Sequence, residues 1–482
     1  MARFDLVLRG GRVIDGSGAP SITADVAIAG ERIAAVDRAP AGSGRAEIDV
    51  AGLAVAPGFI DVHTHDDRAL LSRPDMAPKM SQGVTTVITG NCGVSLAPAE
   101  PGRVLPPPLD LIGSAEHFRF RRFADYLAAL DAAPAAANAA CLVGHSMLRA
   151  QTMDDLRRPA NETEIAAMRE RLKEGLAAGA IGMSSGLWYA PANAAPKSEI
   201  VALAHELHRA GALYTTHMRD EANQVMESLE ESFAVGREAD IPVVISHHKV
   251  LSKENFGRTR ETLPKIAAAI AAQPVGLDAY PYIASSTVLR PENLSRATKI
   301  LITWSKPHPE ATARDLADIA REWGVSERDA CDRLQPAGAI YFMMSEDDVR
   351  RVLAFEHTMI GSDGLPHDTH PHPRLWGTFA RVLGHYCREE KLFPLEEAVR
   401  KMTGLPAARF ALKDRGRITP GAFADITVFD PATVIDRASF EAPTTPAAGI
   451  HLVLVNGKAV WRDGAATGER PGRVLRRAGS AA

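Results

Sequence analysis

The sequence predicts an α/β protein built on a (β/α)8 TIM-like barrel, and three observations support this fold class. Short apolar runs alternate with helical stretches through the middle of the chain, which is typical of a parallel sheet made from βα units. Eight such runs are present, the number that closes a barrel. Both ends of the chain instead carry alternating runs separated by turn signals, which are typical of β-hairpins.

The eight predicted strands lie between residues 58 and 365. They are 58–65, 85–92, 140–145, 180–187, 212–219, 242–249, 275–282 and 358–365. Helical segments fit between several of them; the segment after Asn161 begins with glutamates and ends at Gly179, as expected of helix ends. We therefore expect the barrel to occupy residues 58–413.

The two ends of the chain are expected to form one small β-sandwich domain from residues 1–57 and 414–482. Each end supplies short alternating strands, and Asn456-Gly457 is a strong hairpin signal. Neither set has enough strands to cover its own apolar face, so the two ends are expected to pair with each other. Two separate β-appendages are the alternative.

Two connections are too long for a single helix. The first follows Cys92 and is rich in proline, which excludes regular structure over part of it. The second spans residues 283–357, after the seventh predicted strand, and contains a predicted helix at 312–324. An insertion of this size over the catalytic face of a barrel is a candidate lid.

Composition and charge exclude several classes of protein. The 482 residues are 46% hydrophobic and 24% charged, and 55 lysines and arginines against 59 aspartates and glutamates leave a net charge of −4. This balance favours neither a nucleic-acid nor a membrane partner, and no apolar run is long enough to span a bilayer. Four cysteines in so long a chain do not make a disulfide scaffold; with a start unlike a signal peptide, they predict a cytoplasmic protein.

Polar side chains gather where the predicted strands end, which in a (β/α)8 barrel is the active-site face. They are His63, His65, Cys92, His145, Ser184, Ser185, His217, His247, His248, Lys249, Tyr280 and Asp363. One histidine at a strand end is more often a structural residue. So many potential ligands on one rim indicate a site.

The type and spacing of these residues favour zinc. His63 and His65 point to the same side of a strand, because side chains alternate with a period of two, so both can reach one metal. A thiolate from Cys92 with imidazoles from His217 and His247 would complete a three-ligand set, and mixed sulfur and nitrogen donors favour zinc. The alternative for Cys92 is a small buried apolar residue, which is what we expect of the other three cysteines.

Asp363 is the candidate general base. It stands in the segment GSDG, whose glycines leave the carboxylate accessible. A carboxylate beside a zinc-activated water can take its proton and later pass it to a leaving nitrogen. The alternative is an aspartate that serves a turn.

Several motifs add a family resemblance. GFIDVHTHDD, SHHK and GSDGLPHD are similar to segments of the amidohydrolase superfamily, whereas GNCG, GSDGLPHDTHPHPRLWGTF and VNGKAVWRDG resemble the D-aminoacylases, which are N-acyl-D-amino-acid deacylases. The resemblance runs from Phe4 to Arg476. Many superfamily members bridge two metals with a lysine on the fourth strand, which AIGMSSGL lacks; in the D-aminoacylases a cysteine on the second strand takes this role, and Cys92 matches it.

The resemblance implies a zinc enzyme that hydrolyses N-acyl-D-amino acids to a carboxylate and a free D-amino acid, with Asp363 as the base. The resemblance implies that Cys92, His217 and His247 form a tight zinc site. It implies that His63, His65 and Asp363 form a second site, which is weakly occupied or empty. The positions that match the family's anchors for the substrate carboxylate are Lys249, Tyr280, Ser286 and Arg374. Preference for the D-enantiomer comes from the resemblance alone.

The side-chain preference is left open. Trp188, Tyr341 and Met344 match positions of the family's side-chain pocket and suit an apolar substrate. Arg296 and Lys299 instead place charge in the insertion, where they could select acyl-D-aspartate or acyl-D-glutamate, or could face water.

Two other functions are alternatives. One is a cyclic-amide hydrolase of the dihydropyrimidinase or dihydroorotase kind, and the missing fourth-strand lysine counts against it. The other is an inactive amidohydrolase-like binding protein, which should have lost ligands, whereas all six are present. The expected partner is a small-molecule substrate; the oligomeric state and the number of required metals are not predicted.

Overall fold

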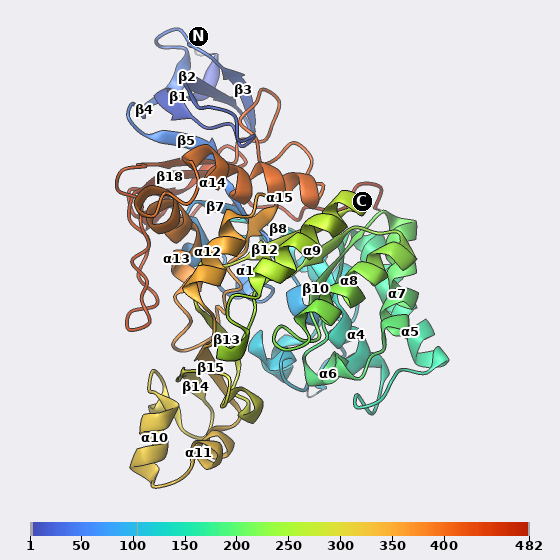
Figure 1. Cartoon of the computed structure of the whole chain (residues 1–482). Helices are drawn as coiled ribbons and strands as arrows, with labels where there is room; N and C mark the ends of the chain where they lie inside the picture. The colour runs from blue at the N-terminus through green and yellow to red at the C-terminus, as the bar shows by residue number, and fades with distance from the viewer. Residues whose placement is uncertain (1–2, 104, 481–482) are drawn as a thin grey trace.

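The computed structural model describes residues 3–103 and 105–480, and within them eight parallel strands form one sheet (Figure 1). These strands are β6 (Phe59–Asp61), β7 (Val84–Thr89), β8 (Asn138–Gly144), β9 (Gly182–Gly186), β10 (Leu213–His217), β11 (Val243–Ile245), β12 (Val275–Ala279) and β16 (Thr358–Ile360). They pair in this chain order from β6 to β16. Each overlaps one predicted strand, which confirms the predicted barrel.

Helices cover the outside of the sheet, as a parallel sheet with two buried faces requires. The main ones are α3 (Phe123–Ala132), α4 (His145–Thr152), α5 (Glu162–Ala178), α7 (Lys197–Ala210), α8 (Val225–Ala239), α9 (Thr259–Ala272), α13 (Arg374–Arg381), α14 (Leu395–Met402) and α15 (Gly404–Arg409). In α5 the Asn161 side chain caps the Glu164 amide, and Gly179 ends the helix with a φ of 117°, as the sequence predicts. Shorter helices are α1 (Ala69–Ser72), α2 (Ala77–Met80) and α6 (Ala190–Asn193).

The barrel closes between its first and last strands by few backbone contacts. Among the described residues, β6 and β16 stand at the two ends of the sheet order. One parallel bridge joins Thr64 to Gly364, and the Asp363 amide donates a 2.8 Å hydrogen bond to the His63 carbonyl. This seam brings residues from the two ends of the barrel sequence side by side.

Strands from both ends of the chain form a second sheet of nine strands in the described part of the protein. They are β1 (Phe4–Val13), β2 (Ile22–Ala29), β3 (Arg32–Val36), β4 (Gly44–Asp49) and β5 (Ala54–Pro57), then β17 (Ile426–Phe429), β18 (Ile450–Val455), β19 (Lys458–Arg462) and β20 (Ala465–Ala466). The two sets join where β5 pairs antiparallel with β17. They share one apolar cluster that includes Leu8, Val55 and Ile426. The two ends therefore pair, and separate β-appendages are excluded; the domain limits at residues 57 and 414 stay predictions.

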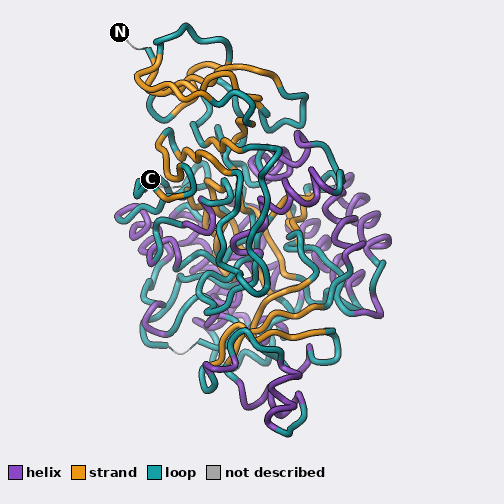
Figure 2. The backbone as a smooth tube through the Cα atoms, turned by 90° about the vertical axis from the view of Figure 1, so that its left-hand side faces the viewer, coloured by secondary structure: helices purple, strands orange, loops and turns teal. Residues whose placement is uncertain are grey.

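The insertion between β12 and β16 carries a small sheet of its own. Strands β13 (Ala284–Val288), β14 (Lys299–Ser305) and β15 (Ala337–Phe342) pair antiparallel, and α10 (Leu316–Trp323), α11 (Glu327–Leu334) and α12 (Glu346–Ala354) accompany them. The predicted helix at 312–324 is confirmed as α10. The small sheet with α10 and α11 lies at the end of the molecule opposite to the sheet of the termini (Figures 1 and 2).

Two global expectations can be compared with the structure. The four cysteines of the chain are all free, in agreement with the prediction that they form no disulfide scaffold. In the part of the chain that the structure describes, none of the helices combines the length and the apolar character that crossing a membrane requires.

Candidate active site

The predicted ligands meet at the carboxyl ends of the barrel strands, and all of them are buried. His63 and His65 follow β6, Cys92 follows β7, His217 ends β10, His247 follows β11 and Asp363 follows β16. The chain thus brings together residues that are 300 positions apart (363 − 63). This convergence follows from the barrel, because parallel strands present their carboxyl ends on one face.

The thiol of Cys92 lies at the centre of the group. Its Sγ atom is 3.3 Å from His63 Nε2, 3.7 Å from His217 Nδ1 and 3.4 Å from His247 Nε2. Sulfur and nitrogen ligands that surround one zinc ion tetrahedrally are themselves about 3.3–3.8 Å apart. The donor types and their spacing therefore fit zinc.

The donors fall into two overlapping groups. In the first group, the ligand atoms of His63, Cys92, His247 and Asp363 lie within 4.8 Å of one another. In the second group, the ligand atoms of His217, His247 and Glu221 lie within the same distance of one another. The Oδ1 atom of Asp363 lies 3.2 Å from His65 Nε2 and 3.5 Å from His63 Nε2. All six predicted ligands are thus within reach of one two-part site.

Three of these residues adopt a backbone conformation that is rare outside glycine. The φ angles of Cys92, His247 and Asp363 are 55°, 37° and 51°. Left-handed conformations of non-glycine residues cost energy and gather at functional sites. The flanking Gly93 also has a positive φ, and a Cβ there would lie 2.6 Å from Ser146 Oγ, so the glycine of the GNCG motif is needed to fit this turn.

The electrostatics of the site favour negatively charged donors. Burial alone would raise the pKa of Cys92, but the neighbouring His63 and His247 lower it well below its ordinary value. Burial also opposes ionisation of Asp363, yet Arg374, whose Nη1 is 2.9 Å away, lowers the pKa of this carboxyl well below its usual range. The thiol and the carboxyl are therefore suited to hold a cation.

Glu221 is a site residue that the sequence reasoning missed. Its carboxylate lies 3.1 Å from His247 Nδ1, 3.7 Å from His217 Nε2 and 2.9 Å from Lys249 Nζ. It thus faces, in both histidines, the ring nitrogen that points away from Cys92. Carboxylates in this position orient metal-binding histidines. The sequence signal is only a glutamate four residues after His217, in the loop that follows β10.

Asp278 is a second residue beside the predicted ligands that the sequence does not reveal. It lies in β12, where the sequence suggests only a buried strand. Its Oδ1 atom accepts a 2.9 Å hydrogen bond from the His247 amide and lies 3.5 Å from His63 Nδ1. Asp278 therefore links a predicted ligand from the first strand, His63, to one from the sixth, His247.

A cavity of about 610 Å³ opens beside the donors. Three of the four predicted carboxylate anchors, Lys249, Tyr280 and Ser286, line it, and Arg374 lies behind it with Nη2 donating to the Ser286 carbonyl at 3.1 Å. The Tyr280 hydroxyl and Ser286 Oγ are buried and have no hydrogen-bond partner among the described residues. Buried polar groups normally have partners, so these hydroxyls suit a bound ligand.

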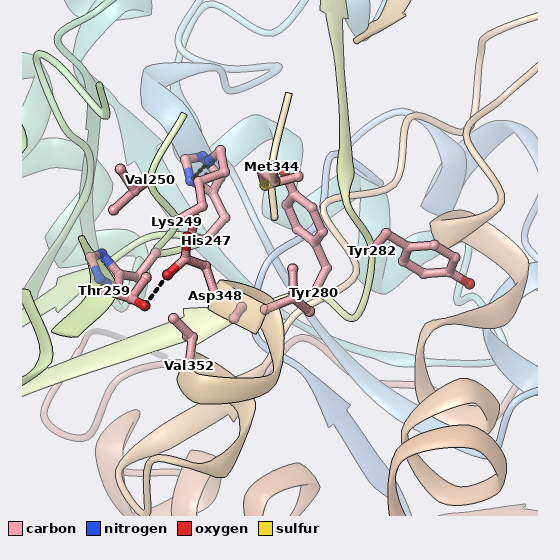
Figure 3. Close-up of a pocket in the computed structure, with 12 residues that line it drawn as sticks. His247, Lys249, Val250, Thr259, Tyr280, Tyr282, Met344, Asp348 and Val352 are labelled. Carbon is pink, nitrogen blue, oxygen red and sulfur yellow. Dashed lines mark hydrogen bonds between the residues drawn. The ribbon is translucent and has the colours of Figure 1, made fainter. Parts of the chain in front are cut away.

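A smaller cavity of about 320 Å³ shares three lining residues with the main one, namely His247, Lys249 and Tyr280 (Figure 3). Thr259 and Asp348 are hydrogen bonded to each other at its far end. Two predicted anchors, Lys249 and Tyr280, thus line both cavities.

Some residues at the strand ends do not join the site. His145 Nε2 lies 2.9 Å from Glu199, which Arg149 also contacts at 2.6 Å, so this histidine belongs to a buried structural network. His248 contacts Thr262 at 2.8 Å, and the predicted Ser184 and Ser185 bond within the barrel.

Only some of the positions expected to contact the substrate side chain line the main cavity. Trp188 and Arg296 line the main cavity. The hydroxyl of Tyr341 donates to the Val288 carbonyl at 2.9 Å, and Met344 lines the smaller cavity, whereas Met343 lines the main one. Among the predicted charges, Lys299 is exposed and lies over the ring of Phe342. Arg296 is therefore the predicted cation of the insertion that reaches the cavity.

A parallel eight-stranded barrel with thiolate, imidazole and carboxylate donors at its carboxyl face defines a metal-dependent hydrolase of the amidohydrolase class. The amidohydrolase family matches the chain over residues 46–325 and 257–461. The chain belongs to this family and, within it, to the D-aminoacylases.

Three curated relatives from Alcaligenes xylosoxydans xylosoxydans support this placement. The chain is 59% identical to a D-aminoacylase, with 98% of both chains covered. It is 52% identical to an N-acyl-D-aspartate deacylase, covering 98% of this chain and 95% of the relative. It is 48% identical to an N-acyl-D-glutamate deacylase, covering 100% and 98%.

Solved structures agree. A crystal structure of D-aminoacylase superposes with a TM-score of 0.97 at 60% identity, covering 98% of this chain and 100% of that one. A second D-aminoacylase structure, concerned with one-metal activation and second-metal attenuation of a binuclear centre, gives 0.96 with the same identity and coverage. The N-acyl-D-glutamate deacylase of Bordetella bronchiseptica, complexed with zinc and a phosphonate mimic of the tetrahedral intermediate, gives 0.95 at 47% identity, covering 98% and 100%.

Proposed function

We propose that this protein is a zinc-dependent N-acyl-D-amino-acid deacylase, which hydrolyses the linear amide to a carboxylate and a free D-amino acid. The observation that carries the proposal is the position of Cys92 Sγ among three imidazoles beside a cavity with unpartnered buried hydroxyls. The relatives with 48–59% identity over nearly their whole length support the same reaction. Nothing in the geometry argues for handedness, so the D-preference rests on these relatives.

We assign the tighter zinc position to Cys92, His217 and His247, and a weaker one to His63, His65 and Asp363. The thiolate and the orientation of both histidines by Glu221 favour the first set. In such a site zinc polarises the acyl carbonyl and lowers the pKa of a water toward about 7. The one-metal activation described for the related D-aminoacylase is consistent with this division.

Asp363 is proposed as the general base and acid. Its carboxylate faces His63 and His65 through Oδ1 and Arg374 through Oδ2, and it lines the cavity. Ionised by Arg374, it can accept the proton of the attacking water and then protonate the leaving amine. The same residue thus removes and returns one proton within a single turnover.

The substrate carboxylate is proposed to bind to Lys249, Tyr280, Ser286 and Arg374. Both cations are buried, and the Arg374 guanidinium lies 4.5 Å from the centre of the Tyr280 ring. An anionic group that binds beside these residues meets the hydroxyl groups of Tyr280 and Ser286 and the positive charges of Lys249 and Arg374. Anchoring the carboxylate here would place the acyl amide over the zinc ligands.

Side-chain specificity is proposed to depend on Arg296. Trp188, Leu251 and Met343 make the cavity mainly apolar, but Arg296 lines it and has no ion-pair partner among the described residues. We therefore propose that acidic side chains are accepted beside apolar ones. Deacylases of N-acyl-D-aspartate and N-acyl-D-glutamate among the relatives support this extension.

The decisive experiment measures hydrolysis of paired N-acetyl-D- and N-acetyl-L-amino acids with apolar and acidic side chains, before and after zinc removal and restoration. We expect D-selective hydrolysis that is lost on chelation and restored by zinc. Hydrolysis of cyclic amides alone would favour the cyclic-amide alternative. Less than about one zinc per chain without activity would favour a binding protein. A cytoplasmic location and the absence of nucleic-acid and membrane partners stay predictions from the sequence.

A further inference from the structure

A buried lysine outside the proposed site stands at the seam of the barrel. Lys79 lies in α2 and is fully buried. Its Nζ atom lies 2.8 Å from Asp61 Oδ2, 2.8 Å from Ser362 Oγ and 3.3 Å from Asp66 Oδ2. A buried charge is costly unless it is paired and hydrogen bonded, so these contacts are energetically significant.

Asp61 and Ser362 belong to the two strand ends that the barrel must join. Asp61 ends β6, two residues before His63, and Ser362 follows β16, one residue before Asp363. The second oxygen of Asp61 accepts hydrogen bonds from the Ser362 amide at 2.8 Å and from the His63 amide at 3.3 Å. One carboxylate therefore holds both strand ends, and Lys79 holds that carboxylate.

The hydrogen bonds reach three successive amides around the proposed base. The Ser362 amide binds Asp61, the Asp363 amide binds the His63 carbonyl at 2.8 Å, and the Gly364 amide donates to Ser362 Oγ at 3.3 Å. Asp363 itself is in the left-handed region at a φ of 51°. A conformation of this kind persists only where its surroundings determine it.

We propose that Lys79 is a positioning residue for Asp363: its ammonium group clamps Asp61 to Ser362 and so holds the loop of the base against the first strand of the barrel. The inference rests on the role proposed for Asp363. Few backbone contacts close this seam. The contacts of Lys79 with Asp61 and Ser362 therefore keep Asp363 aligned with His63. Misplacing a catalytic group by about 1 Å can cost about 100-fold in rate.

The test compares two buried lysines replaced by methionine. In Lys79→Met we expect kcat to fall about 100-fold, with KM changed less than about threefold and about one zinc per chain retained, because Lys249, Cys92 and His217 are untouched. We also expect faster hydrogen exchange at the amides of 362–364. The control, Lys401→Met, removes a lysine of α14 that is equally buried but donates to the Phe355 carbonyl at the end of α12. It should lower the melting temperature and leave kcat and this exchange unchanged.

Ser362 provides a milder variant if Lys79→Met does not fold. Ser362→Ala removes only the hydroxyl that Lys79 contacts, and we expect a fall in kcat of about tenfold that Ser362→Thr restores. Unchanged kcat or unchanged exchange at 362–364 in a folded Lys79→Met protein would overturn the clamp. If the wild-type protein hydrolyses no N-acyl-D-amino acid, the proposed function fails instead, while the exchange comparison still decides whether Lys79 holds the loop.

Discussion

Arg374 Nη1 lies 2.9 Å from Asp363 Oδ2, both side chains are buried, and Asp363 lines the cavity. This pair joins the proposed base to a proposed anchor of the substrate carboxylate. Burial would raise the pKa of Asp363, but Arg374 lowers it well below its usual range. In the proposed mechanism, substrate binding and proton transfer would therefore be coupled through this ion pair.

Replacing Asp363 by asparagine should abolish turnover without emptying the site. Asparagine keeps the shape of the side chain but cannot accept the proton of water, so kcat should fall about a thousandfold or more. Steady-state kinetics and zinc analysis check this. An activity within about tenfold of wild type would mean that another group transfers the proton.

Cys92→Ala should remove the tighter zinc. The thiolate lies within 3.7 Å of three imidazoles, so its loss leaves only neutral nitrogen donors in the set. We expect less than about half a zinc per chain and no measurable hydrolysis. Cys141→Ala is the matched control, because Cys141 is buried in β8 away from the donors; it should keep zinc and activity.

Glu221→Gln should weaken zinc binding while the protein stays folded. The variant removes the negative charge that faces the outer nitrogens of His217 and His247, and the loss of such a partner typically costs about 10–100-fold in metal affinity. Competition with a chromophoric chelator measures the change. An unchanged zinc affinity would show that Glu221 serves Lys249 alone.

Arg296→Leu should move the preference from acidic toward apolar side chains. Loss of a charged hydrogen-bond donor costs about 1.5–3 kcal/mol, so kcat/KM for acyl-D-aspartate and acyl-D-glutamate should fall about 10–100-fold relative to apolar substrates. Lys299→Leu is the matched control, since Lys299 does not line the cavity. If the ratio of kcat/KM for acidic to apolar substrates is the same in both variants, Arg296 does not determine the side-chain specificity.

Asp368→Asn should stabilise the protein at pH 8 and have little effect at pH 4. Burial raises the pKa of Asp368 to about 7, and its Oδ2 has no partner among the described residues. Between the ordinary value of 3.8 and about 7 the folded state holds a proton that the unfolded state has lost, so this group's contribution to stability falls as pH rises through that window. The cost is complete above about pH 7 and is at most about 4 kcal/mol.

Thermal unfolding of both proteins at pH 4, 6 and 8 measures this effect. The difference in melting temperature should grow with pH between these values. A difference that is the same at all three would assign the change to packing rather than to ionisation.

Local patterns in the sequence, namely apolar runs, turn residues and the period of side chains along a strand, predict much of the fold and of the candidate site. The eight strands were recognisable because apolar runs and turn residues recur along the chain, and the six predicted ligands because they lie at the carboxyl ends of the predicted strands. His63 and His65 share a face through the period of the strand itself. His145 stands at the end of a predicted strand in the same way, but it begins α4, and Glu199 and Arg149, on α7 and α4, hold it in a buried network away from the site.

What the sequence by itself determined is the barrel, the pairing of its two ends and the donor types that favour zinc. Only the tertiary structure decided which neighbours hold those donors: Glu221 behind two histidines, Asp278 between His63 and His247, and Lys79 across the seam. The physical reason is that such contacts depend on the closure of the barrel. Closure sets side chains from distant strands 2.8–3.5 Å apart, and nothing in the local sequence around either partner encodes that distance.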